Sequence, residues 1–425
     1  MPTVDSFLNN DDWEKDFEIE LLMIADHSMF DAFVELYRGD DFAAYHGLSD
    51  YLRGLFEQTK TIFNRFVFFE KHHINLKLAG AMIISRQQDC PLKSALLVSE
   101  NVTDYEDFKV PNLSFSLDID ALDAIHLLEN WIWEHAEFLP LHDHAVFVTK
   151  FDLLSAKNES STQGMAYVKA MCREGESTSI IEDIGGLTTS AIIAHELAHS
   201  LGAYHDGFGE SASCSADQNF LMASSASGSE FSANFANNFL LSPCSTKQIE
   251  NFLNSPESRC LWKKRTKEKP RLFYRSSDAL LQKREKKPGE LFDRNRQCMI
   301  AFGPHYGFCN NREYHHKRGD PCRRLWCKNR KKKRISPCET KSYLPLMDGT
   351  KCHDSKWCIS GACVHNEFAV FDKRKCEDVN KGYCQKQPAS QLELFCRKHS
   401  FKDICCATCE HVIQQFKKDL KILVD

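Results

Sequence analysis

The segment HELAHSLGAYHD, residues 195–206, holds residues whose types and spacing could do chemistry. His195 and His199 are four residues apart, so on a helix both imidazoles lie on one face and can reach one zinc ion. Gly202 permits the left-handed turn that ends such a helix, and His205 can then return as the third ligand. Three protein ligands leave the fourth tetrahedral position to water, as in a catalytic zinc site.

Glu196 follows the first of these histidines, where its carboxylate can hydrogen-bond that water. Zinc lowers the pKa of the water to about 7 and polarises a carbonyl, so Glu196 can act as general base and then protonate the leaving amine. The alternative is a set of surface histidines on an amphipathic helix. The imidazoles would then lie unpaired beside a core face, which is costly. That face is formed by their apolar neighbours Ile192, Ile193, Leu197 and Leu201. The sequence therefore favours a zinc-dependent hydrolase.

The flanking hydrophobic pattern predicts the elements that position this segment. Strands are predicted over 17–26, 72–85, 144–153 and 177–183. Helices are predicted over 29–67, 121–136, 187–202 and 245–254, the last with a capping box of Ser245 and Gln248. Strands that alternate with helices over about 250 residues predict an α/β domain in which helices pack on a sheet.

Cysteine usage indicates the compartment and the organisation of the rest of the chain. The chain has 425 residues, enough for about two to four domains. Of 19 cysteines, fourteen lie between Cys298 and Cys409, a density typical of disulfide-stapled modules made in an oxidising compartment. An intracellular zinc-ribbon array would need repeated C-x2-C pairs, and only Cys406 and Cys409 have that spacing.

Three sequons agree with secretion, at Asn101, Asn112 and Asn158. Residues 1–17 are acidic and lack the apolar core of a signal peptide, so we expect a mature or truncated chain without its signal peptide and prodomain. The net charge of −5 gives no argument for nucleic acid, and no apolar run approaches the ~20 residues of a membrane span.

The pattern HExxHxxGxxH resembles the metzincin signature, and Asp206 after the third histidine resembles the adamalysin/reprolysin branch. The resemblance implies a metzincin catalytic domain over 17–262, with a twisted mixed sheet and packed helices. It also implies a methionine turn under the zinc site, for which Met222 is the candidate. The alternative for Met222 is an ordinary core methionine.

The same resemblance implies two disulfides, Cys172–Cys260 and Cys214–Cys244, which leave Cys90 over. It further implies a structural calcium ion held by Glu20, Asp143 and the carbonyl of Cys260. The family's usual asparagine after that cysteine is Lys263 here. Plain surface carboxylates are the alternative for Glu20 and Asp143.

Small disulfide-rich, loop-rich modules are expected after a basic linker at 263–287. Residues 288–364 contain eight cysteines and resemble the disintegrin-like and cysteine-rich region of ADAMTS proteases, in CRRLWC and DGTKCHDSKWCISGACV among others. Residues 376–410 resemble a PLAC module. A generic disulfide knot is the alternative for the first of these. The family's thrombospondin repeat is not found between them.

The sequence as a whole predicts a secreted zinc endopeptidase that cuts extracellular matrix or host proteins. The alternatives are a catalytically silent matrix- or adhesion-binding protein and an intracellular metalloenzyme. The basic linker and KNRKKKR at 328–334 could dock on sulfated glycosaminoglycan, be cut by basic-specific convertases, or be solvated loops.

Overall fold

The computed structural model describes residues 16–69, 73–93, 118–155, 162–225, 233–262, 286–311, 314, 319–332, 337–366, 378, 381–396, 401, 405, 407–409 and 412. The chain divides into two compact units, Met1–His365 and Asn366–Asp425. The three sequons, Lys263 and nearly all of the basic linker lie outside the described residues. No helix in the described ranges is both long and apolar enough to cross a membrane.

A mixed five-stranded sheet forms the centre of the first unit, in the order β2-β1-β4-β7-β6. Strands β1 (Asp16–Ala25), β2 (His73–Ile83), β4 (His144–Thr149) and β7 (Thr178–Glu182) run parallel. Strand β6 (Gly164–Ala166) pairs antiparallel with β7 and ends the sheet order. Successive side chains of β1 enter two different cores, as expected for a strand covered on both faces.

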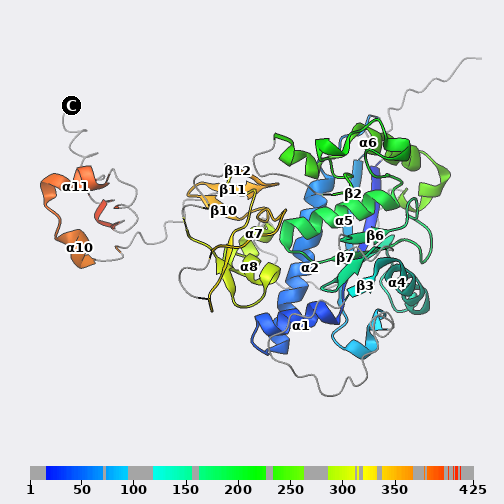
Figure 1. Ribbon diagram of the computed structural model, residues 1–425, viewed down its shortest axis with the longest axis horizontal. Helices are drawn as coiled ribbons and strands as arrows, with labels where there is room; N and C mark the ends of the chain where they lie inside the picture. Colours follow the sequence, from blue (N-terminus) through cyan, green and yellow to red (C-terminus); the bar gives the residue numbers. More distant parts are fainter. Residues whose placement is uncertain are drawn as a thin grey trace, which may run out of the picture. The chain divides into compact units, whose positions relative to one another are not determined.

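Helices cover the two faces of this sheet (Figure 1). Helices α1 (His27–Leu36), α2 (Asp41–Phe63) and α5 (Gly186–Ser200) share the larger core. Helix α4 (Ala121–His135) packs into the core on the opposite face. A two-stranded parallel sheet, β3 (Asp118–Asp120) with β5 (Asp152–Leu154), completes this layer.

Short helices and turns connect these elements to the carboxyl end of the domain. They are η1 (Gln87–Asp89), η2 (Gly209–Ser211), η3 (Ala216–Gln218), η4 (Ala233–Phe239), α6 (Pro243–Leu253) and η5 (Pro256–Leu261). The mixed α/β architecture agrees with the fold class predicted from the sequence.

Three local predictions were wrong. The helix predicted over 29–67 is two helices, because Arg38 and Gly39 both adopt positive φ and Asp40 caps α2 anew. The strand predicted over 144–153 breaks at 150–151 into β4 and β5.

The third error concerns the start of α6. Pro243 occupies the first turn, and the Ser242 hydroxyl caps the helix by accepting from the backbone N–H of Ser245. Gln248 therefore forms no capping box, and its side chain instead accepts from the backbone N–H of Tyr204 at 3.0 Å.

The described residues of 286–365 form a loop-rich, disulfide-rich part of the first unit. Its elements are α7 (Pro288–Leu291), α8 (Arg294–Phe302), β8 (Tyr306–Phe308), β9 (Cys327–Asn329), β10 (Lys351–His353), β11 (Lys356–Ile359) and β12 (Ala362–His365). Its disulfides are Cys298–Cys327, Cys309–Cys338, Cys322–Cys358 and Cys352–Cys363.

The second unit contains α10 (Lys381–Gln385) and α11 (Ala389–Cys396). Among its described residues, the disulfides Cys384–Cys405 and Cys396–Cys409 enclose a small core. Cys376 and Cys406 lie outside the described residues.

Candidate metal centre

Helix α5 presents His195 and His199 toward His205, which returns after the helix has ended. Leu201 ends α5, and Gly202 takes the left-handed turn with φ +100°, as its position in the sequence predicted. Nε2 of His205 lies 3.1 Å from Nε2 of His195 and 3.1 Å from Nε2 of His199. The structure thus brings the three imidazoles to one point.

The other ring nitrogen of two of these histidines fixes the tautomer. Nδ1–H of His195 donates to the carbonyl of Leu221 at 2.7 Å, and Nδ1–H of His199 donates to the carbonyl of Ala203 at 2.8 Å. Because a carbonyl only accepts, each Nε2 presents a lone pair to the shared point. Burial lowers the pKa of all three histidines, that of His199 to about 4, so the rings are neutral near pH 7.

This arrangement fits a zinc ion. His205 can donate at most one proton to two facing lone pairs, so the protein atoms alone cannot satisfy all three nitrogens. Nitrogens bound to tetrahedral zinc at about 2.0–2.1 Å would lie roughly 3.3 Å apart, close to the spacing seen. The carbonyls that hold Nδ1 are the usual partners of metal-binding histidines.

Glu196 directly follows His195 on α5 and is buried. Burial raises the pKa of its carboxyl to about 8, a range suited to taking up and releasing a proton. Gly164 of the edge strand β6 lies against it: a Cβ at Gly164 would be 2.7 Å from Oε1 of Glu196. The Glu196 carboxylate therefore lies against β6, the last strand in the order of the described sheet.

Asp206 and Met222 support the loop that carries His205. The backbone N–H of Asp206 donates to the carbonyl of Met222 at 2.9 Å, and the Ser242 hydroxyl donates to Oδ1 of Asp206 at 2.7 Å. Met222 is fully buried, and its neighbour Leu221 holds His195. The Met222 segment thus links helix α5, which carries His195, to the loop that carries His205.

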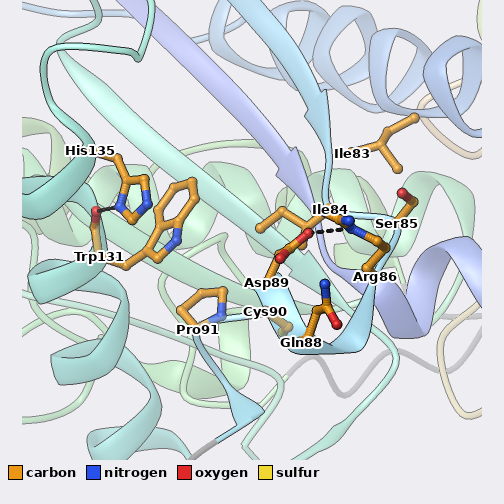
Figure 2. Close-up of a pocket in the computed structure, with 10 residues that line it drawn as sticks. All are labelled: Ile83, Ile84, Ser85, Arg86, Gln88, Asp89, Cys90, Pro91, Trp131 and His135. Atoms are coloured by element: carbon orange, nitrogen blue, oxygen red, sulfur yellow. Dashed lines mark hydrogen bonds and ion pairs between the residues drawn. The ribbon is translucent and has the colours of Figure 1, made fainter.

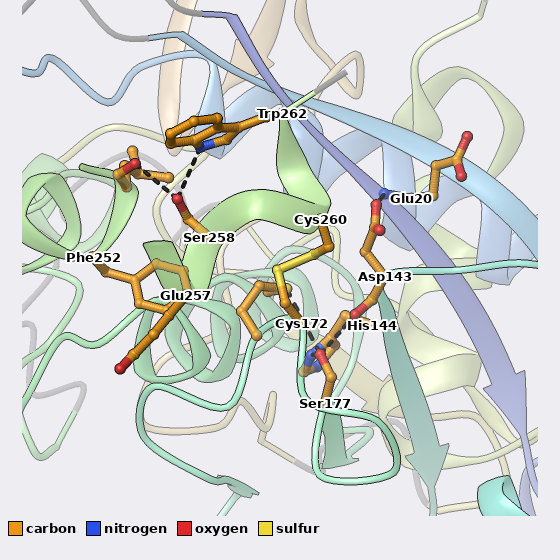
Figure 3. The surroundings of a disulfide bond; sticks show 12 residues. Glu20, Asp143, His144, Cys172, Ser177, Phe252, Glu257, Ser258, Cys260 and Trp262 are labelled. Atoms are coloured by element: carbon orange, nitrogen blue, oxygen red, sulfur yellow. Dashed lines mark hydrogen bonds between the residues drawn. A yellow bond between two sulfur atoms is a disulfide. The ribbon is translucent and has the colours of Figure 1, made fainter. Parts of the chain in front are cut away.

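The structure joins Cys172 to Cys260 and Cys214 to Cys244 and leaves Cys90 buried and free. The first bridge lies near Asp143 (Figure 3). Oδ2 of Asp143 accepts from the backbone N–H of Glu20 at 2.8 Å, whereas the Glu20 carboxylate points away from Asp143. The two carboxylates named for calcium are neighbours but do not meet at one point.

Some residues of the centre were not found from the sequence. Gly164 and the carbonyls of Leu221 and Ala203 act through contacts that only the fold creates. A single glycine in a short strand has no spacing that could reveal its role.

The fold and the three converging histidines define a metzincin type of zinc metalloprotease domain. Residues 115–264 match the model of the reprolysin (M12B) family of zinc metalloproteases, and residues 288–364 match the ADAMTS cysteine-rich domain 2. Over these residues the chain is ADAMTS-like, with a reprolysin-type metzincin domain that is followed by an ADAMTS-type cysteine-rich domain.

Two curated relatives illustrate the similarity. The human protein named "A disintegrin and metalloproteinase with thrombospondin motifs 16" is 35% identical over 224 residues, covering 52% of this chain and 16% of the relative. The mouse protein with the same name and number 1 is 29% identical over 301 residues, covering 69% of this chain and 28% of the relative. The chain thus spans less than a third of the length of these relatives.

Proposed function

We propose that this chain is a secreted zinc-dependent endopeptidase that hydrolyses extracellular proteins, with Glu196 as general base. The observation that carries the proposal is the convergence of the Nε2 atoms of His195, His199 and His205 at the helix that also carries the buried Glu196. The disulfides of the described residues support an extracellular setting.

The proposed mechanism assigns a role to each group. His195, His199 and His205 would hold zinc, which when bound supplies a Lewis acid for water and for the peptide carbonyl. Glu196 accepts a proton from the attacking water and passes it to the leaving amine nitrogen. Because β6 ends the sheet order, an extended substrate can pair along its outer edge. Gly164 of that strand lets the peptide and the Glu196 carboxylate approach each other.

The test uses the purified chain, its metal content and a complex protein mixture as substrate. Glu196→Gln should keep one zinc at the histidines and lose about 10²–10⁴-fold in turnover, because only proton transfer is removed. Glu134→Gln, the same change on the exposed face of α4, is the matched control. New amino termini, found by mass spectrometry, would reveal the preferred bonds. Undiminished cleavage by Glu196→Gln would refute the mechanism.

We further propose that the chain is organised as a catalytic domain at 17–262, a basic linker at 263–287, an ADAMTS-type module at 288–364 and a PLAC-like module at 376–410. The residues matched by the two family models support the middle boundaries.

Calcium is proposed at Glu20, Asp143 and the carbonyl of Cys260. The proximity of Asp143 to the Cys172–Cys260 bridge supports this site. For both carboxylates to bind one calcium ion, the Glu20 side chain would have to rotate toward Asp143. Millimolar Ca²⁺ should raise the melting temperature of the wild type and leave the melting temperature of the Asp143→Asn variant unchanged. An equal response of the two proteins would remove calcium from this site.

Glycosaminoglycan binding is proposed for the basic runs, of which the exposed Arg330, Lys331 and Lys332 are described. A heparin column should retain the chain and release it at lower salt after these three are changed to Gln. Unchanged elution would show that these residues take no part.

A further inference from the structure

A second cluster of metal-binding residue types lies at the carboxyl ends of β1 and β2. Asp26 and His27 follow β1 at the start of α1, and Cys90 follows the turn η1 after β2. A ring nitrogen of His27, a carboxylate oxygen of Asp26 and the sulfur of Cys90 all lie within 4.8 Å of one another. All three residues are buried, and none belongs to the histidine centre.

For two members of this cluster, His27 and Cys90, the structure shows no role in the absence of a metal ion. Nδ1 of His27 is buried and makes no hydrogen bond within the described part of the chain, although the residue is only 6% exposed. A buried polar nitrogen without a partner is costly and therefore rare. Cys90 is the one described cysteine outside a disulfide, and it is 4% exposed.

The third member, Asp26, is firmly positioned. Its carboxylate accepts from the Ser28 hydroxyl at 2.6 Å, from the Thr149 hydroxyl at 2.7 Å and from the backbone N–H of Met29 at 3.1 Å. Capping α1 through Met29 explains the presence of Asp26, but it explains neither His27 nor Cys90. Hydrogen bonds of this kind are what orients the ligands of a metal site.

Backbone groups also converge on the sulfur. The backbone N–H groups of Leu92 and His27 hydrogen-bond the Cys90 thiol and favour its ionised form. Burial, and secondly the charge of Asp26, nevertheless raise the pKa of Cys90 to about 12.

Cys90 also lines a surface cavity of about 620 Å³ (Figure 2). Arg86, Asp89, Trp131 and His135 form other parts of its wall, and Arg86 and Asp89 form an ion pair at 2.7 Å within that wall. Cys90 is the member of the cluster that lines this cavity, which makes the cavity a candidate route of entry for an ion.

We propose that Asp26, His27 and Cys90 form a second zinc site, distinct from the histidine centre. One sulfur, one nitrogen and one oxygen donor suit zinc, with water as the fourth ligand. The ion gives the His27 ring nitrogen a partner and ties the β1–α1 junction to the segment after β2. The site stabilises the carboxyl ends of β1 and β2 and takes no part in peptide hydrolysis.

The test loads the full chain with Co²⁺ in place of zinc. Only a thiolate ligand gives sulfur-to-cobalt charge-transfer absorption in the near ultraviolet, and the histidine centre has no sulfur. The wild type should bind two equivalents of Co²⁺ and show this band. Cys90→Ser should lose the band and one equivalent, whereas His199→Ala should weaken the other site and keep the band.

His27→Gln provides a second route that leaves the thiol in place. It should weaken Co²⁺ binding at the thiolate site about 10- to 100-fold, as loss of a ligand or of its support does in known metal sites. A wild type without the band, or a band that survives in Cys90→Ser or is unaltered in His27→Gln, would overturn the proposal. The wild-type spectrum decides even where Cys90→Ser does not fold.

Discussion

Gly164 has no side chain where it meets the Glu196 carboxylate, and this contact governs where the carboxylate can lie. In Gly164→Ala the added methyl would displace Oε1 of Glu196, because this oxygen would be its nearest atom and ends a flexible side chain. We expect kcat to fall about 10- to 100-fold, because misplacing a catalytic group by about 1 Å has effects of that size. The bound zinc should be unchanged.

The matched control is Gly54→Ala in α2, where the nearest atom would lie at an ordinary 3.6 Å. Steady-state kinetics with a quenched peptide and metal analysis check both variants. Full activity of Gly164→Ala would show that Glu196 is positioned by something other than this contact.

Glu182 at the end of β7 gives a prediction for pH. Burial, and secondly the charge of Asp152, raise its pKa from 4.5 to about 7. Between those values the folded chain binds more protons than the unfolded chain, so this group lowers stability as the pH rises. Glu182→Gln removes the charge and should raise the melting temperature more at pH 8 than at pH 5.

Thermal melts from pH 4 to 8 measure this effect, with the exposed Glu134→Gln as reference. If the gain of Glu182→Gln over the wild type were constant across that range, the carboxyl would not titrate as described.

The amino end of helix α5 depends on a buried network around Asp183. Its carboxylate accepts from the Tyr51 hydroxyl of α2 and the Thr189 hydroxyl of α5, both at 2.7 Å, and pairs with Lys150 at 2.8 Å. Burial alone would raise the pKa of Asp183, but Lys150 and these hydroxyls outweigh it and lower the pKa. The network thus fixes the helix that carries His195 and His199.

Lys150→Met should cost about 3–5 kcal/mol of unfolding free energy, because it leaves a buried carboxylate without its counter-charge. Lys77→Met, which removes a surface pair with Glu18, should cost at most about 1 kcal/mol. Urea denaturation of the two variants provides the comparison. Equal losses would mean that Asp183 does not need Lys150.

Sequence patterns predicted the elements whose apolar residues form an uninterrupted run or an uninterrupted helical period. The apolar run of β1 and the helical spacing around His195 depend on local periodicity, and both elements appear within two residues of their predicted ends. The break at Arg38 and Gly39 was missed because the apolar spacing continues across it. The roles of Gly164 and Asp183 could not be predicted, since each depends on partners distant in sequence.

The first unit as a whole has a core to which its cysteine-rich part contributes. Phe292, Tyr343 and Met347 belong to the same buried cluster as α2 and α5. Met347 packs on Gly186, where a Cβ would lie 3.0 Å from it, and the Thr188 hydroxyl donates to the carbonyl of Tyr343 at 3.1 Å. This cysteine-rich part of the first unit, within residues 286–365, therefore covers the amino end of the helix that carries the metal-binding histidines.

A chain ending at Trp262 should consequently be much less stable than one ending at Asn366, which retains the whole first unit. Each large apolar side chain that loses its burial costs about 1.5–3 kcal/mol, and 1 kcal/mol corresponds to about 2–4 °C at this size. Calorimetry should show a fall of more than about 10 °C in the shorter chain, with new binding of a hydrophobic dye. Equal melting temperatures would instead show that the catalytic domain holds its helix α5 without help from the cysteine-rich part.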